Sequence, residues 1–88
     1  MPEVVVYLTP YCPYCVRARA LLDRKGVRYR VIDVGTDPRL WADMERRSQR
    51  STVPQIFIGD RHVGGYDDMA ELDAEGRLDA LLGLRQAG

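Results

Sequence analysis

The stretch that decides the fold is residues 3–15, which read EVVVYLTPYCPYC. Residues 3–9 are mostly β-branched, aromatic or leucine, and the run is too short for a helix, so it predicts a buried strand. Pro10 ends that strand. From Pro13 the apolar residues recur at helical spacing, and the proline in the first turn and Gly26 at the end favour a helix between them. The apolar positions of this helix are Val16, Ala18, Ala20, Leu21 and Leu22.

The next part of the chain predicts a second strand and a second helix. Val27 to Val34 alternates apolar and polar residues, which is typical of a strand. We expect it to lie parallel to the first strand, because a helix connects the two. Asp37 and Pro38 then resemble an N-cap followed by a first-turn proline. The helix that they begin contains Leu40, Trp41, Met44 and Arg47.

The last third of the chain predicts a hairpin and a helical end. Gln55 to Gly59 and Arg61 to Gly64 are expected strands, and Gly59-Asp60 suits a tight turn between them. A final helical region is expected from about Asp67 to Leu84, interrupted at Gly76. The order of elements is therefore βαβαββα with a helical extension. It predicts an α/β chain with the thioredoxin fold, a four-stranded mixed sheet with helices on both faces.

Length and composition narrow the possible functions. The 88 residues allow a single domain, 1–88, and the 45% hydrophobic and 30% charged residues are an ordinary globular balance. The formal net charge at pH 7 is zero, which gives no reason to expect a nucleic-acid or anionic-membrane partner. No segment approaches the roughly 20 apolar residues of a membrane span. The N-terminus lacks the basic region of a secretory signal, so the expected location is cytoplasmic.

The two cysteines of the chain, Cys12 and Cys15, stand at the junction of the first strand and the first helix. A helix N-terminus carries unpaired N–H groups and about half a positive charge, which stabilises a thiolate. We therefore expect Cys12, at the cap position, to have a lowered pKa and to be the attacking thiol. Cys15 follows nearly one helical turn later on the same face. Its thiol can therefore reach the Cys12 sulfur, and we expect it to be less exposed to solvent than Cys12.

Other uses of a C-x-x-C pair are less well supported by the sequence. Structural zinc takes four ligands, and His62 is the only other good soft-metal ligand, so we expect no metal site. A disulfide that closes so short a loop adds little stability. Two inert core cysteines remain an alternative, although a helix cap is a poor place to hide a thiol. In a cytosolic chain with a βαβ pattern, C-x-x-C favours redox chemistry.

Three segments in this order and spacing carry a family resemblance: Cys12-Pro13-Tyr14-Cys15, Thr52-Val53-Pro54-Gln55-Ile56-Phe57-Ile58-Gly59 and Gly64-Gly65-Tyr66-Asp67-Asp68. Over nearly all its length the chain resembles the glutaredoxin family, and most of all its bacterial glutaredoxin 3 type, the CPYC dithiol class. The resemblance implies a catalytic Cys12 and Cys15, and a glutathione site made of Tyr14, Thr52, Val53, Pro54, Gly65, Tyr66 and Asp67.

The resemblance also implies a role for each part of that site. Pro54 would be a cis-proline that leaves the Val53 backbone free to pair with the cysteinyl backbone of glutathione. Gly65, Tyr66 and Asp67 would hold the γ-glutamyl end through backbone N–H groups and a carboxylate, with Gly65 allowing close approach. Tyr14 would flank the bound disulfide. Most of the segment that follows Pro54, Ile56 to Ile58, is expected to be core.

Two positions depart from the family pattern. Thr9 stands where many glutaredoxins have a lysine that favours the thiolate and the glycyl carboxylate of glutathione, and Trp41 stands where arginine or glutamine is common. Trp41 is expected to be core or groove wall. The three arginines of the second helix, Arg39, Arg46 and Arg47, could compensate, or could simply form a solvated face. His62 is expected to be exposed.

The predicted function is reduction of protein disulfides and glutathione mixed disulfides by thiol–disulfide exchange through Cys12 and Cys15. Glutathione would be a cosubstrate rather than a bound cofactor, the other partners would be disulfide-bearing or glutathionylated proteins, and we expect a monomer. One alternative is a thioredoxin-like protein reduced by a flavin reductase. Another is a [2Fe–2S] carrier that shares a cluster between Cys12 of two chains, which Pro13 tends to disfavour in this family.

Overall fold

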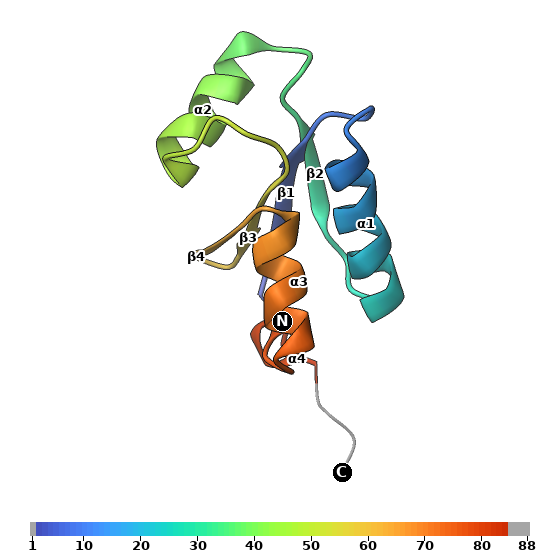
Figure 1. Ribbon diagram of the computed structural model, residues 1–88. Coiled ribbons are helices and arrows are strands. Elements are labelled where there is room, and N and C mark those ends of the chain that lie inside the picture. The colour runs from blue at the N-terminus through green and yellow to red at the C-terminus, as the bar shows by residue number, and fades with distance from the viewer. Residues whose placement is uncertain (1, 85–88) are drawn as a thin grey trace.

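A mixed four-stranded sheet forms the centre of the molecule in the computed structural model, which describes residues 2–84 (Figure 1). The strands are β1 (Val4–Leu8), β2 (Arg30–Asp33), β3 (Gln55–Ile58) and β4 (Arg61–Gly64), in the spatial order β2-β1-β3-β4. β1 pairs parallel with β2 and antiparallel with β3, and β3 pairs antiparallel with β4. The predicted thioredoxin fold is confirmed.

Helices cover both faces of the sheet, as the sequence predicts. They are α1 (Pro13–Lys25), α2 (Pro38–Ser48), α3 (Tyr66–Ala74) and α4 (Leu78–Leu81). Because successive strand residues point to opposite faces, β1 contributes to two cores. Val4, Val6 and Leu8 pack against α1, α3 and α4, whereas Val5 and Tyr7 pack against Met44 of α2. Figure 1 shows α2 set apart from α1 and α3.

The ends of the first two helices agree with the sequence signals. Gly26 ends α1 in the left-handed conformation with φ 70°, which glycine adopts without steric cost. The Asp37 side chain accepts a hydrogen bond from the Arg39 N–H at the start of α2, where Pro38 occupies the first turn. The predicted interruption at Gly76 is also present, with φ 73° between α3 and α4.

Several expected details are wrong. The second strand is shorter than Val27–Val34, because its pairing with β1 begins only at Arg30 opposite Val5. Val16 is 56% exposed, because the buried face of α1 is formed by Cys15, Ala18, Leu21 and Leu22. Ala20, four residues after Val16, shares its exposed face. By contrast, α3 begins at Tyr66, which agrees with the expected start at about Asp67.

His62 is half-buried rather than exposed. Its ring lies 4.9 Å from the ring of Phe57, and its Nε2 lies 2.7 Å from Oε1 of Gln55. The pairing of β4 with β3 sets His62 opposite Phe57, and the imidazole packs over this buried strand.

Candidate active site

The loop between β1 and α1 presents Cys12 as the N-cap of α1. Its backbone is extended, with φ −79° and ψ 123°, and its carbonyl accepts the first helical hydrogen bond, 3.0 Å from the Val16 nitrogen. Cys12 is half-buried, whereas Cys15 is only 1% exposed. The predicted difference between an accessible thiol and a covered thiol is therefore present.

The surroundings of the two thiols separate their pKa values. Burial raises the pKa of Cys12, but hydrogen bonds from the backbone and thiol of Cys15 and from the Tyr14 backbone outweigh it, so the pKa lies below its ordinary value. Burial raises the pKa of Cys15 to about 11, helped by its hydrogen bond with Cys12 and by the charge of that thiolate. Cys12 is therefore the more readily ionised of the two thiols, and Cys15 stays protonated at neutral pH.

The loop before β3 approaches Cys12 from 41 residues away. Antiparallel pairing sets Gln55 opposite Tyr7 near the end of β1, so the residues that precede Gln55 lie beside the residues that follow β1. The Cys12 Sγ lies 3.9 Å from the carbonyl oxygen of Val53, and the Val53–Pro54 peptide bond is cis. The cis-proline expected from the resemblance is confirmed.

A groove of about 220 Å³ extends from this point. Its walls come from the start of α1, from the loop before β3 and from the start of α3, which are distant in the sequence. All seven residues expected to contact glutathione line it: Tyr14, Thr52, Val53, Pro54, Gly65, Tyr66 and Asp67. The fold thus brings the predicted substrate residues together next to Cys12, and their roles toward a ligand stay predictions.

Two charged residues that the sequence analysis did not single out as site residues, Arg50 and Asp68, also line the groove. Asp68 Oδ2 accepts hydrogen bonds from the Gly65 N–H and from Nη1 of Arg50, both at 2.9 Å. These two donors, the Gly65 backbone first and Arg50 second, hold the pKa of the Asp68 carboxyl below its usual range. The spacing of Gly65 and Asp68, N-cap to third helical residue, could have indicated this capping contact.

The glycine that the local geometry requires is Gly64 rather than Gly65. Gly64 has φ 117°, and a Cβ there would stand 2.4 Å from Asp68 Oδ2. At Gly65, with φ −86°, a Cβ would meet only ordinary contacts, such as the Pro54 carbonyl oxygen at 3.6 Å. The expected close approach of a ligand to Gly65 therefore stays a prediction.

The residues at the two departures from the family pattern have other partners. The Thr9 carbonyl oxygen accepts a hydrogen bond from the Cys12 N–H at 3.4 Å. Trp41 is half-buried and packs against the core on the α2 face. It is absent from the groove lining, as are the three arginines of α2. Arg39 pairs with Asp37, Arg46 pairs with Asp43, and Arg47 donates to the Tyr7 hydroxyl at 2.7 Å.

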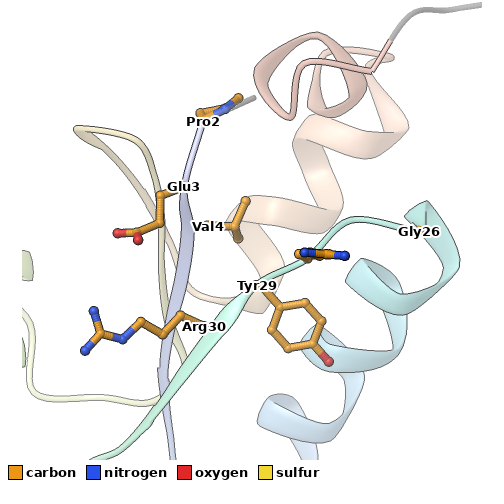
Figure 2. A pocket seen from close by; sticks show the side chains of 7 residues that line it. Pro2, Glu3, Val4, Gly26, Tyr29 and Arg30 are labelled. Atoms are coloured by element: carbon orange, nitrogen blue, oxygen red, sulfur yellow. The ribbon is translucent and has the colours of Figure 1, made fainter.

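A second, larger hollow of about 530 Å³ lies at the opposite end of β1 (Figure 2). Figure 2 shows the side chains of Glu3 and Arg30 on one side of the strands, and those of Val4 and Tyr29 on the other. Both cysteines lie outside this hollow, so it offers no thiol to a substrate.

Within residues 2–84, no three histidine, cysteine or acidic side chains gather where they could hold a metal ion.

Comparison with known proteins agrees with this geometry. The family model named Glutaredoxin matches residues 4–63. The chain belongs to the glutaredoxin family. It is 52% identical over 82 residues to a glutaredoxin of Pseudomonas aeruginosa, covering 93% of this chain and 98% of the relative. It is 48% identical to glutaredoxin 3 of Escherichia coli K12, covering 93% and 99%.

A solved structure provides a further comparison. The buckwheat glutaredoxin–glutathione complex superimposes on this glutaredoxin with a TM-score of 0.86 at 33% identity, covering 93% of this chain and 77% of that one. Family membership makes the chain a thiol oxidoreductase of the glutaredoxin type. The family resemblance of the three sequence segments is confirmed.

No helix within residues 2–84 is long and apolar enough to cross a membrane.

Proposed function

We propose that this glutaredoxin reduces glutathione mixed disulfides and protein disulfides, with glutathione as the source of electrons. The observation that carries the proposal is the position of the Cys12 thiol, which is 3.9 Å from the Val53 carbonyl beside the groove and has a lowered pKa. A nucleophilic thiol beside a peptide-sized groove suits a disulfide flanked by a peptide-like molecule.

The proposed chemistry is two successive thiol–disulfide exchanges. The Cys12 thiolate attacks the glutathionyl sulfur of a mixed disulfide, a new S–S bond forms, and the substrate leaves as a thiolate that takes up a proton. A second glutathione thiolate then attacks the glutathionyl sulfur on Cys12, which releases oxidised glutathione and restores the Cys12 thiolate. For an intramolecular protein disulfide, the Cys12 thiolate attacks one sulfur and the other sulfur leaves as a thiol. Cys15 then loses its proton and attacks the Cys12 sulfur, which releases the substrate as a dithiol and forms a Cys12–Cys15 disulfide. Two glutathione molecules reduce that disulfide and leave as oxidised glutathione.

The groove would orient glutathione through backbone groups. The Val53 backbone would pair with the cysteinyl residue of the tripeptide as an added strand does, next to Thr52 and Pro54. The backbone N–H of Tyr66, at the positive N-terminal end of α3, would receive the γ-glutamyl carboxylate, and Asp67 would face its amino group. The Gly65 N–H is already bonded to Asp68 Oδ2, so Gly65 would contribute only the space beside the ligand. Tyr14, which is 49% exposed, would flank the disulfide. The glutathione complex of the buckwheat relative supports glutathione as the ligand.

The partners follow from this chemistry. We propose glutathione as a cosubstrate, without a resident cofactor. We further propose glutathionylated or disulfide-bearing proteins as substrates, and a single-domain monomer in the cytoplasm as the working form. A net charge of +0 offers no electrostatic attraction to nucleic acid or anionic membranes.

The test is a coupled assay in which glutathione, glutathione reductase and NADPH are supplied with a glutathionylated peptide. We expect turnover that depends on glutathione and on Cys12. A parallel reaction replaces glutathione and its reductase with thioredoxin reductase. Turnover only in that second reaction would contradict the proposal and favour the thioredoxin-like alternative.

A further inference from the structure

A glutamine amide is completely buried beneath the groove. Gln55, the first residue of β3, has no exposed surface, and a buried amide is costly unless its polar atoms are hydrogen-bonded. Its Nε2 donates to the Thr52 carbonyl oxygen at 3.0 Å and to the Thr52 hydroxyl at 3.1 Å. Its Oε1 lies 2.7 Å from Nε2 of His62. Both ends of the amide are thus occupied, one by the groove loop and the other by the hairpin.

The hydrogen bond to the Thr52 carbonyl fixes more than that oxygen. The Thr52 carbonyl and the Val53 N–H belong to one planar peptide unit, and in a trans unit the two groups point in opposite directions. The described residues contain one cis bond, which is the next one, Val53–Pro54. Holding the carbonyl toward Gln55 therefore turns the Val53 N–H away from Gln55.

The Val53 N–H is the group proposed above to pair with glutathione. Thr52 and Val53 both line the groove. Among residues 2–84, the Val53 N–H donates to no protein acceptor, so it is available to an incoming ligand. A ligand that binds by strand-like pairing needs this N–H at a fixed orientation, since misdirected hydrogen bonds weaken steeply with angle.

His62 holds the glutamine in turn. When its Nε2 carries the proton, the imidazole donates to Oε1 of Gln55 and leaves both amide hydrogens for Thr52. The imidazole is itself held by β4 and by the Phe57 ring at 4.9 Å. A continuous path of contacts thus leads from the hairpin to the groove loop.

We propose that Gln55 and His62 are positioning residues for glutathione: the buried pair orients the Thr52–Val53 peptide so that its N–H faces the groove. This inference rests on the proposed glutathione site. It assigns a function to two residues that do not line the groove. It predicts that their loss weakens glutathione recognition while the Cys12 thiol remains reactive.

The experiment measures KM for glutathione and kcat in the coupled assay for Gln55→Met and His62→Phe. Methionine keeps the length of the side chain without its donors, and phenylalanine keeps the aromatic contact with Phe57 without the imidazole donor. Loss of the hydrogen bond to the Thr52 carbonyl should raise KM about fivefold in Gln55→Met. kcat at saturating glutathione and the pKa of Cys12 should hardly change. His62→Phe should raise KM less, because the amide remains.

Two further variants separate positioning from general stability. His62→Gln restores a donor toward Gln55 and should recover most of the wild-type KM. Tyr29→Phe removes a hydrogen bond to Asp23, 2.8 Å long, at the far end of the molecule, so it serves as a matched control that leaves KM unchanged. In the Gln55→Met background, His62→Phe should add almost nothing, because the path is already broken.

The outcomes distinguish this inference from the proposed function. If the wild-type chain does not turn over the glutathionylated peptide with glutathione, the proposed function fails and this inference fails with it. If the wild type is active but KM is unchanged in folded Gln55→Met and in His62→Phe, only the positioning role is overturned. A fall in kcat with constant KM would indicate a merely structural role and would also overturn it.

Discussion

Replacing Cys15 separates the two activities proposed for the site. Its thiol is 1% exposed and has a pKa of about 11, so at pH 7 only about one thiol in 10,000 is ionised. Cys15 therefore contributes nothing as the first attacker. Cys15→Ser should keep most of the deglutathionylation rate, because a second glutathione resolves the mixed disulfide on Cys12.

The same variant should lose most of its reduction of an intramolecular protein disulfide. Cys15 acts there as a tethered second thiol, and its removal replaces a unimolecular step with a bimolecular one. The expected loss is about 100-fold or more. The assay compares the variant and the wild type on a glutathionylated peptide and on a peptide with one internal disulfide, both coupled to glutathione.

Cys15→Ala is the matched control for the electrostatic part of the argument. The Cys15 thiol donates one of the hydrogen bonds that lower the pKa of Cys12. Serine keeps a donor there and alanine does not, so the Cys12 pKa should be higher in the alanine variant, because the thiolate loses one hydrogen bond. The rate of Cys12 alkylation as a function of pH measures this pKa.

Equal loss of both activities in a folded Cys15→Ser variant would refute the division of roles between the two thiols.

Three further predictions test other parts of the site. Cys12→Ser should reduce both activities to background in the coupled assay, and substantial turnover by this variant would exclude Cys12 as the nucleophile. Thr9→Lys should place a cation near the thiolate and the glycyl carboxylate and lower KM for glutathione; an unchanged KM with a lower Cys12 pKa would show that the cation acts on the thiolate alone. Asp68→Asn should destabilise the fold by about 1 kcal/mol at neutral pH, because it weakens the contacts to Gly65 and Arg50. The pKa of Asp68 is lower in the folded state than in the unfolded state, so its carboxylate stabilises the fold above the unfolded-state pKa. This stabilisation is lost as the pH falls through the folded-state pKa, so urea unfolding should show the difference in stability between variant and wild type disappearing in acid. A difference in stability that persisted in acid would contradict this argument.

The catalytic end of the site was predictable because its signals are local. A strand followed by proline and a C-x-x-C at a helix start predicts that Cys12 caps α1, and the cap position favours the thiolate form of Cys12. The expected substrate residues came instead from a family resemblance. The structure gathers them in one groove, while their contacts with glutathione remain to be tested.

Local signals in the sequence predict the order of the elements and the unequal burial of the two thiols, because helical spacing, capping and turn residues act over a few positions. The tertiary structure alone decided which distant groups meet. Arg50 reaches Asp68 across 18 residues, and His62 turns inward to Gln55 instead of facing water. The first contact depends on the order of the strands and the second on the burial of β3, and neither is specified by signals that act over a few neighbouring residues.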